Sequence, residues 1–355
     1  MLLSDCRNLL RGVVSLRDNG DGTQTPLRFT PGQMAFYHTD PGYSIRTRAS
    51  AGICLDCVTD ARRLTLAGAA CPGSSVDQWS FDLMVDRCLV AHREGSIARS
   101  PLLELAFDLP EGSKRVQLFF PCLAEIRIRS LTLEGGSFAR PSEQKMRLLC
   151  LGDSITQGYT VSFPCLAYAS ELALMLDAEL LNQAVAGETF QPGMLADAPA
   201  FRPDLITVAY GTNDWNCKSP EQLARDAEAF LSRLRALWPE TPLVVITPIW
   251  RADVSDHPER WPFAEVDGLI RRAAQAHRAE VIVGAELFPA MAELMADGLV
   301  HPGNLGHRLY ATRLAARLQA LGLGAFSAGA AAAGTIVCTI FTHWDHSPLY
   351  SFFPA

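Results

Sequence analysis

The stretch MRLLCLGDSITQG, residues 146–158, decides how the second half of the chain is interpreted. It begins as a short apolar run, which is typical of a buried strand, and it ends in a polar turn that contains Gly152 and Ser154. Similar apolar runs occur further along the chain, at residues 205–209, 243–246 and 281–283.

Helical patterns separate these apolar runs. The most regular one covers residues 221–237, with Ser219 as the expected N-cap and Pro220 at the first helical position. Other helices are expected over residues 163–176, 265–276 and 304–320. Strands that alternate with helices predict a parallel sheet covered on both faces, a three-layer α/β/α arrangement. In such sheets the ligand crevice lies at the carboxyl ends of the strands.

The first part of the chain has a different period. Apolar residues tend to alternate from about residue 27 to residue 133, with turn signals between the segments, and no long helical pattern interrupts them. This pattern predicts an all-β sandwich or jelly-roll domain. We expect a sandwich over residues 1–140, an α/β domain over 144–323 and a poorly defined extension over 324–355, with the boundary inside 136–143.

Composition narrows the classes of partner. The chain has 355 residues, a hydrophobic fraction of 48% and a net charge of -7, and it has no basic stripe. Because phosphate binding needs clustered lysine and arginine, a nucleic-acid partner is not expected. We read the ten cysteines as reduced thiols of a cytoplasmic protein. Cys54 and Cys57 could form half a metal site or a redox pair, but they lack a second such pair or a histidine-rich partner, so no metal is expected. No nucleotide-binding glycine-rich loop follows a predicted strand, so no cofactor is expected either.

The two ends of the chain bear on membrane association. The first twelve residues are interrupted by Asp5 and Arg7 and do not resemble a signal peptide. Residues 318–342 carry no charge, which nominally suits a membrane span. Their alanines and glycines contribute little to insertion, so we favour a C-terminal extension over a tail anchor and expect no membrane partner. Whether the protein forms a homo-oligomer is left open.

Four segments supply polar groups directly after predicted strands or near the C-terminus. They are residues 152–156, 182–187, 211–214 and 297–302. A serine hydroxyl is a weak nucleophile unless an adjacent base takes its proton, and histidine suits that role near neutral pH. Ser154 and His301 are therefore the candidate nucleophile and base, and Gly187 lets the backbone approach a substrate without a Cβ in the way.

These motifs, taken together over residues 148–318, resemble the SGNH (GDSL-like) hydrolase superfamily. The name of that superfamily records a Ser, a Gly, an Asn and a His, which here are Ser154, Gly187, Asn213 and His301. The resemblance implies a flavodoxin-like sheet, serine ester hydrolysis and an oxyanion hole. It assigns the three oxyanion donors to the backbone N–H of Ser154, the backbone N–H of Gly187 and the side-chain amide of Asn213.

The chain departs from the family pattern at one position. The family usually places an aspartate three residues before the histidine, whereas Asp297 lies four residues before His301, with Val300 as the extra residue. We expect Asp297 to complete a triad; the alternative is a dyad whose histidine is oriented by a backbone carbonyl. Asp153 is expected to support the turn, with substrate contact as a further candidate role. Trp215 is expected either to line the substrate pocket or to pack in the core.

Each motif also has a simpler explanation. Ser154 could be a helix N-cap, Asn213 an Asx turn, Gly187 an ordinary loop glycine and His301 a cap of the final helix. His307 is expected to be a surface or packing residue. Four separate simple explanations are jointly improbable, which favours the catalytic interpretation.

A sandwich ahead of an SGNH domain resembles the layout of carbohydrate esterase family 2. This resemblance favours a hydrolase that removes short acyl groups, acetyl above all, from a carbohydrate or another small ester. The alternatives are a lysophospholipase or acyl-thioesterase acting on lipids, and a non-catalytic binding protein. The sandwich could bind glycan, cover the site or stabilise a dimer, and Trp79, Phe36 and Tyr37 could stack on sugars or pack in the core.

Overall fold

A computed structural model describes residues 9–324 of the chain. The segments on which the membrane arguments depend lie wholly or largely outside these residues: most of the first twelve residues, most of 318–342, and all but one residue of the extension expected over 324–355. Within residues 9–324, no helix is long and apolar enough to cross a membrane.

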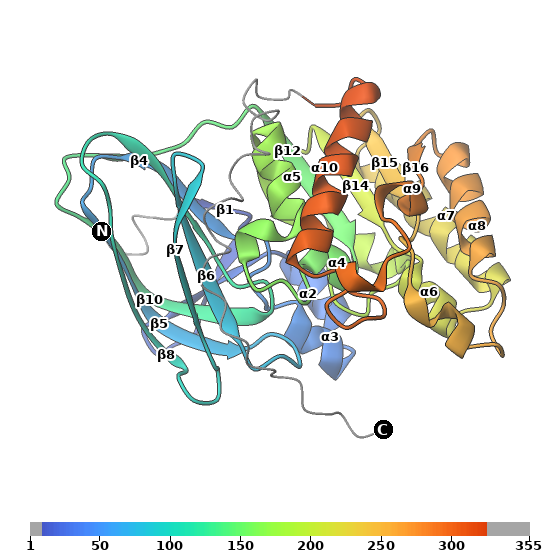
Figure 1. The fold of residues 1–355 in the computed structure, drawn as a ribbon, viewed down its shortest axis with the longest axis horizontal. Coiled ribbons are helices and arrows are strands. Elements are labelled where there is room, and N and C mark those ends of the chain that lie inside the picture. The colour runs from blue at the N-terminus through green and yellow to red at the C-terminus, as the bar shows by residue number, and fades with distance from the viewer. Residues whose placement is uncertain (1–8, 325–355) are drawn as a thin grey trace.

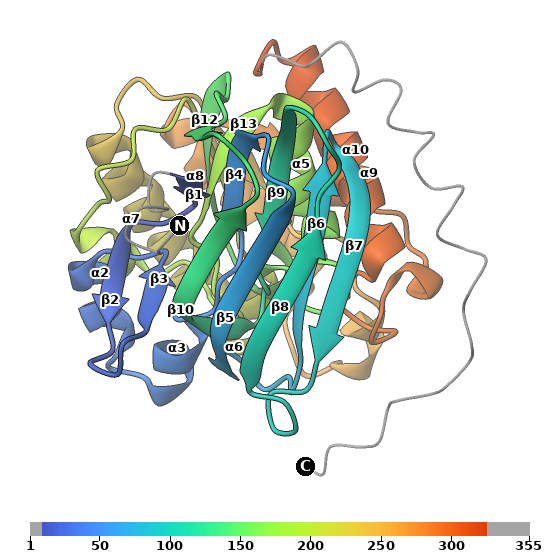
Figure 2. The same cartoon turned by 90° about the vertical axis from the view of Figure 1, so that its left-hand side faces the viewer.

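The N-terminal part of the chain, called the front half below, forms two antiparallel sheets that pack face to face (Figures 1 and 2). The first contains, in spatial order, β1 (Leu10–Arg11), β4 (Cys54–Thr59), β9 (Lys114–Phe119), β6 (Trp79–Val85) and β7 (Cys88–Gly95), with β11 (Ala139–Pro141) also paired to β4. The second contains β2 (Ser15–Asp18), β3 (Gln24–Leu27), β10 (Ala124–Glu134), β5 (Arg63–Pro72) and β8 (Leu102–Asp108). Alternate side chains of both sheets meet in one apolar core.

A parallel five-stranded sheet follows. Its spatial order is β13 (Ala178–Asn182), β12 (Met146–Gly152), β14 (Leu205–Ala209), β15 (Leu243–Ile246) and β16 (Glu280–Ile282), so the second strand along the chain lies outside the first. This is the order of flavodoxin-like sheets, in which the chain reverses direction across the sheet between β13 and β14. The bottom of the candidate site is therefore set by the carboxyl ends of β12, β13 and β14.

Helices cover both faces of this sheet, as expected (Figure 1). On one face α5 (Tyr168–Leu176) and α10 (Asn304–Ala320) pack with Leu148 and Val244. On the other, α7 (Pro220–Leu237) and α8 (Ala264–Ala276) pack with Leu149 and Val208. Shorter helical segments complete the domain: α4 (Ser154–Gln157), η2 (Pro164–Leu166), η3 (Pro192–Ala196), α6 (Thr212–Cys217), η4 (Ala252–Asp256), α9 (Gly284–Leu287) and η5 (Ala292–Leu294).

The predicted fold class is confirmed, with one difference in the front half. Two short helices, α2 (Pro31–Tyr37) and α3 (Pro41–Arg46), lie between β3 and β4. Each begins with a proline at its first position after a capping residue, Thr30 or Asp40, which are signals of a helix N-terminus. The alternating pattern around them hid these signals, so the segment was expected to be β structure.

The segment from residue 28 to residue 46 leaves the sandwich and packs on the α/β domain. Phe29, Met34 and Tyr37 are buried in the same core as Val185 and the helices α7 and α8. Tyr37 is therefore a core residue and not a sugar platform, whereas Phe36 packs against the same core and is only half-buried. Trp79, the third aromatic candidate, is buried in the sandwich core. Part of the front half therefore belongs physically to the body that carries the candidate site.

Two further predictions concern cysteines and metals. The cysteines among residues 9–324 are free thiols, and Cys54 and Cys57 are both buried. Across the same residues, no group of three or more histidine, cysteine, aspartate or glutamate side chains could hold a metal ion.

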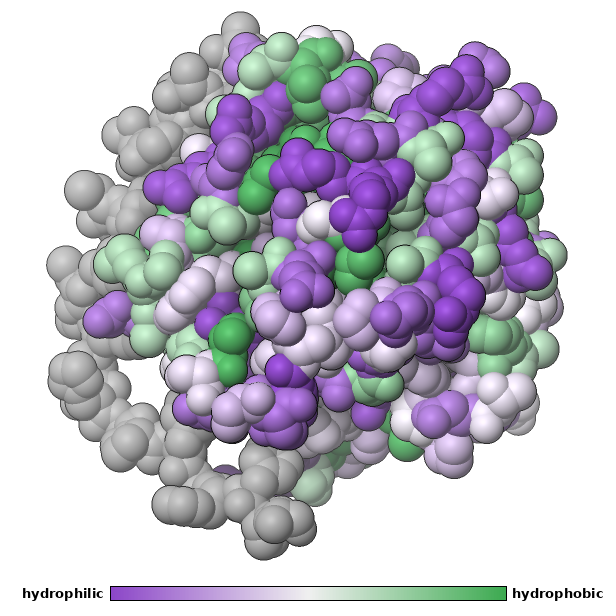
Figure 3. All heavy atoms as spheres, turned by 90° about the vertical axis from the view of Figure 1, so that its right-hand side faces the viewer, coloured by the Kyte–Doolittle hydropathy of each residue, from purple (hydrophilic) through white to green (hydrophobic). Residues whose placement is uncertain are grey.

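The face of the molecule on the side of α7 and α8 is largely hydrophilic, with apolar residues scattered across it (Figure 3).

Candidate active site

Gly152 and Asp153 place Ser154 at the end of β12. A Cβ at Gly152 would lie 2.2 Å from the Thr156 hydroxyl, so only glycine fits this turn. The carboxylate of Asp153 accepts a hydrogen bond from the Ile155 N–H at 2.9 Å and caps α4. Asp153, and not Ser154, is therefore the N-cap. Burial raises the pKa of Asp153 to about 6, and its side chain, which is 3% exposed, supports the turn.

The structure brings Ser154, His301 and Asp297 into one hydrogen-bonded chain. Ser154 Oγ lies 2.8 Å from His301 Nε2, and His301 Nδ1 lies 2.6 Å from Asp297 Oδ2. The Tyr159 ring packs against the imidazole, with 4.7 Å between ring centroids. One ring nitrogen of His301 thus faces the serine and the other faces a carboxylate, which is the geometry of a nucleophile, a base and an orienting acid.

The extra residue between Asp297 and His301 is absorbed by a tight turn. Asp297 Oδ1 accepts hydrogen bonds from the N–H groups of Leu299, Val300 and His301, at 2.9, 2.8 and 3.0 Å. Gly298 takes a left-handed conformation, with φ of +73°. Partial burial acts to raise the pKa of Asp297, but the bonds from His301 and from these N–H groups outweigh it and hold the pKa below its ordinary value. Asp297 therefore stays ionised beside the imidazole.

The loop after β13 carries Gly187, whose φ of +83° is left-handed. Within residues 9–324, neither the Gly187 N–H nor the Ser154 N–H has a hydrogen-bond acceptor. The Asn213 side-chain amide donates to the Glu188 carbonyl at 2.9 Å, which leaves its second hydrogen for another acceptor. The three donors expected from the resemblance thus keep N–H groups available.

Two buried carboxyl groups, Glu188 and Asp214, belong to or contact this loop, and Glu188 is in none of the predicted site positions. Glu188 is fully buried, burial raises its pKa to about 7, and it follows Gly187 directly in sequence. Asp214 is also fully buried; it accepts from the Phe190 N–H at 3.1 Å and pairs with Lys218 at 2.9 Å. An acidic residue directly after a motif glycine was the only sequence signal for Glu188.

Trp215 and His307 are interior residues. Trp215 is 2% exposed, its indole donates to the Trp261 carbonyl at 2.7 Å, and the guanidinium groups of Arg251 and Arg260 each lie 4.8 Å from its ring. The suggestion that Trp215 lines the substrate pocket is therefore corrected in favour of core packing. His307 is fully buried, accepts from the Tyr168 N–H at 3.2 Å, and burial lowers its pKa to about 4.

Side chains from the front half of the chain reach the Gly187 loop. Tyr43 Oη donates to the Gly187 carbonyl at 2.9 Å, and Arg46 Nη1 donates to the Ala186 carbonyl at 2.8 Å. Both residues lie on α3. No sequence signal marks them, because no motif links a residue of the first domain to a loop about 140 positions later.

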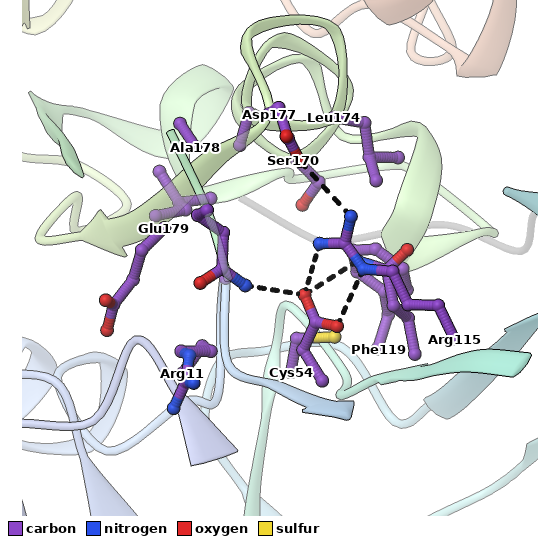
Figure 4. Close-up of a pocket in the computed structure, with 15 residues that line it drawn as sticks. Arg11, Cys54, Arg115, Phe119, Ser170, Leu174, Asp177, Ala178 and Glu179 are labelled. Atoms are coloured by element: carbon purple, nitrogen blue, oxygen red, sulfur yellow. Dashed lines mark hydrogen bonds and ion pairs between the residues drawn. The ribbon is translucent and has the colours of Figure 1, made fainter. Parts of the chain in front are cut away.

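A cavity between the two halves of the molecule lies apart from this site. Its lining includes Arg115, which pairs with Asp56 on the sandwich at 2.7 Å and with Asp177 on the α/β domain at 3.2 Å. Figure 4 shows the Arg115 guanidinium pointing toward Asp177 across the cavity. Arg115 thus forms ion pairs with both halves, and these ion pairs link the sandwich to the α/β domain.

The chain is similar to known proteins in sequence and in fold. Residues 150–309 match the model of the GDSL-like lipase/acylhydrolase family. A salicylyl-acyltransferase, SsfX3, from a tetracycline biosynthetic pathway is similar in structure, with a TM-score of 0.76 and 23% identity over 88% of this chain and 94% of that one. No curated protein matches the chain in sequence.

Two carbohydrate esterases of family two are also similar in structure. The one from Cellvibrio japonicus has a TM-score of 0.61 and 16% identity, over 89% of this chain and 96% of that one. The one from Clostridium thermocellum, in complex with cellohexaose, has a TM-score of 0.57 and 16% identity, over 77% of this chain and 94% of that one. At these identities the likeness shows the fold.

The match over residues 150–309 places this part of the chain with the GDSL-like lipases and acylhydrolases, and it supports an esterase of the SGNH type. Its sandwich followed by a flavodoxin-like sheet is the layout shared with the family-two carbohydrate esterases.

Proposed function

We propose that the protein removes short acyl groups, acetyl above all, from a carbohydrate or another small ester through an acyl-enzyme on Ser154. The observation that carries the proposal is the hydrogen-bonded chain from Ser154 Oγ through His301 to Asp297, next to two N–H groups without acceptors. This arrangement supplies a nucleophile, a base and oxyanion donors within one site. We assign Ser154, His301 and Asp297 as the triad on this basis.

The proposed reaction proceeds in two balanced steps. His301 Nε2 takes the proton of the Ser154 hydroxyl while Oγ attacks the carbonyl carbon of the ester. The tetrahedral intermediate places its negative oxygen toward the N–H groups of Ser154 and Gly187 and the amide of Asn213. Its collapse breaks the bond to the alcohol, which leaves with the proton from His301. Water then repeats the sequence on the acyl-enzyme and releases the carboxylic acid and free Ser154.

A short acyl group on a carbohydrate is the substrate class that the layout favours. The two neighbours from Cellvibrio japonicus and Clostridium thermocellum are described as carbohydrate esterases, and the second was solved with cellohexaose. The alternative is a lipid-directed enzyme, which needs a long apolar acyl channel. Neither the cavity lined by Arg115 nor a second cavity, lined by Tyr210 and Tyr310 among others, has Ser154 or His301 in its lining.

The acceptor of the acyl group is a separate question. The neighbour SsfX3 is described as a salicylyl-acyltransferase, and a transferase passes the acyl group to an acceptor other than water. In a Ser154 acyl-enzyme the same chemistry serves both outcomes, because His301 can deprotonate water or an alcohol. We propose hydrolysis, and the ratio of free acid to acyl ester formed in the presence of a sugar alcohol measures the alternative directly.

The experiment compares initial rates on p-nitrophenyl acetate and p-nitrophenyl octanoate for wild type and Ser154→Ala. We expect an acetate preference that Ser154→Ala abolishes, with a loss of about 10⁴-fold or more because nothing else in the site can form the acyl-enzyme. An octanoate preference would move the substrate class to lipids. A wild type that is inert and is not labelled by a serine-reactive phosphonate would refute the hydrolase proposal.

Domain bounds and compartment follow as further proposals. We infer a sandwich domain over residues 1–140 and a catalytic domain over 144–323, and β11, inside the predicted boundary 136–143, pairs with the sandwich strand β4. The free thiols of the described cysteines fit a reducing compartment such as the cytoplasm. In that compartment the substrate would be an imported oligosaccharide or another small ester.

A further inference from the structure

We infer that Arg46, from the front half of the chain, is a positioning residue of the reaction: it orients and polarises the peptide unit that supplies the Gly187 oxyanion donor. The inference rests on the proposed function. It begins from a single contact, the hydrogen bond of 2.8 Å from Arg46 Nη1 to the Ala186 carbonyl oxygen.

The Ala186 carbonyl and the Gly187 N–H belong to the same peptide unit. The unit is planar, and residues 9–324 contain no cis peptide bond, so its C=O and N–H point in opposite directions. A donor that fixes the carbonyl oxygen on one side therefore fixes the direction of the N–H on the other. Arg46 holds the carbonyl, and the N–H remains without an acceptor in the described part of the chain.

The charge of Arg46 adds a second effect. A cation bound to a carbonyl oxygen draws electron density through the amide and strengthens the N–H as a donor, as in any hydrogen-bonded chain. Among residues 9–324, Arg46 forms no ion pair with a carboxylate, so its charge is not neutralised by a direct partner. A Cβ at Gly187 would lie 2.8 Å from Arg46 Nη1, so the glycine is needed for this close approach as well as for its positive φ.

Neighbouring peptide units of the loop are held in the same way. Tyr43 Oη donates to the Gly187 carbonyl at 2.9 Å, and Asn213 donates to the Glu188 carbonyl at 2.9 Å. Three consecutive carbonyls, those of residues 186, 187 and 188, are thus each bound by a side chain. Two of the three side chains come from α3, so the front half of the chain takes part in holding the oxyanion loop.

The support beneath α3 is itself buried. Arg28 donates to the carbonyls of Asn182 and Ala184, the latter at 3.1 Å, and the amides of Gln33 and Gln183 bond to each other. The first and the last residue of segment 28–46, Arg28 and Arg46, therefore both contact the stretch that leads from β13 to Gly187. These hydrogen bonds fix the orientation of the loop's N–H groups before the substrate binds. Such preorganisation is what oxyanion stabilisation requires.

The test measures kcat and KM on p-nitrophenyl acetate for Arg46→Ala, Arg46→Lys and Tyr43→Phe. Losing an oxyanion donor costs about 10²–10³-fold in kcat, so misaiming and weakening one should cost about tenfold or more for Arg46→Ala, with KM little changed. Arg46→Lys keeps the charge and should recover part of the loss. Affinity for a boronic acid, whose adduct with Ser154 places an oxygen in the oxyanion position, should weaken in parallel with kcat.

Arg48→Ala is the matched control, because the Arg48 guanidinium lies 3.5 Å from Glu125 of the sandwich and does not contact the loop. It should keep the wild-type kcat. If Arg46→Ala folds and keeps its kcat while Ser154→Ala is inactive, the inference is overturned and the hydrolase proposal stands. A rise in KM alone would make Arg46 a substrate-binding residue and also overturn it. If Arg46→Ala does not fold, Arg46→Gln, which removes the charge and keeps a polar side chain, decides by the same criteria; an inert wild type refutes both proposals.

Discussion

The two sides of the candidate site are built from different parts of the chain. On the acid–base side, Ser154, His301 and Asp297 all come from the α/β domain, and Asp297 lies only four residues from His301. On the oxyanion side, the loop around Gly187 is held by Tyr43 and Arg46, which lie about 140 residues earlier. The first side is local to one domain, whereas the second depends on how the two halves dock.

This difference shows how a segment from the N-terminal half of the chain is tied to the candidate site. A histidine oriented by a nearby carboxylate needs only a correct turn, which Gly298 and the three N–H groups bonded to Asp297 Oδ1 provide. A loop with a positive φ at Gly187 needs partners for its carbonyls, and the helix that flanks the sandwich supplies two of them. Substitutions should therefore impair the acid–base residues and the oxyanion loop independently of each other.

The largest effect is expected on the acid–base side. Asp297→Ala should lower kcat on p-nitrophenyl acetate by about 10³–10⁴-fold, because the imidazole loses the group that fixes its tautomer and stabilises its charged form. Asp297→Asn should be comparably impaired. Exposed Asp256→Ala is the control and should retain activity. If Asp297→Ala loses less than tenfold, the site works as a Ser154–His301 dyad.

A smaller effect, on folding, is expected from the support of the oxyanion side. Arg28→Met removes a buried guanidinium that donates to the carbonyls of Ala49, Asn182 and Ala184. These acceptors would be left unsatisfied, and the free energy of unfolding in urea should fall by about 2–4 kcal/mol. Exposed Arg129→Met should leave stability nearly unchanged. A wild-type stability for Arg28→Met would mean that the segment is held by its apolar contacts alone.

The smallest effect concerns pH. Burial raises the pKa of Glu188 to about 7 in the folded state, well above its ordinary value of 4.5. Between these two values the folded state holds a proton that the unfolded state has released, so the stabilisation is present at low pH and is lost as pH rises through about 7. Glu188→Gln cannot ionise, and its stability relative to wild type should improve by on the order of 2 kcal/mol between about pH 5 and pH 8.

Unfolding in urea at a series of pH values measures this difference. Exposed Glu293→Gln is the matched control and should follow the wild-type curve. A Glu188→Gln curve parallel to wild type would show that Glu188 is ionised in the folded protein at low pH as well. In that case the carboxylate would have to be stabilised by its bonds to the Thr189 N–H and the Gln191 amide.

The α/β domain was largely predictable because its elements follow local rules. The helix over 304–320 and the strands over 205–209 and 243–246 appear with the expected bounds, since apolar runs and capping residues act within a few positions. The helices α2 and α3 were missed although Thr30-Pro31 and Asp40-Pro41 mark their starts, because both are shorter than any helical period can reveal. The sequence left open whether Trp215 lines the substrate pocket or packs in the core, because the residue type alone does not determine burial.

The sequence by itself determined the alternation of strands and helices in the α/β domain and the change of period between the two halves. It also singled out the candidate residues Ser154, Gly187, Asn213, Asp297 and His301. These features are local, because hydrogen bonds within a helix and side-chain alternation along a strand act over a few residues. Only the tertiary structure decided that Asp297 reaches His301 across one extra residue, that Glu188 is buried, and that Tyr43 and Arg46 hold the Gly187 loop. Those contacts join segments far apart in the chain, and their geometry exists only once both halves have docked.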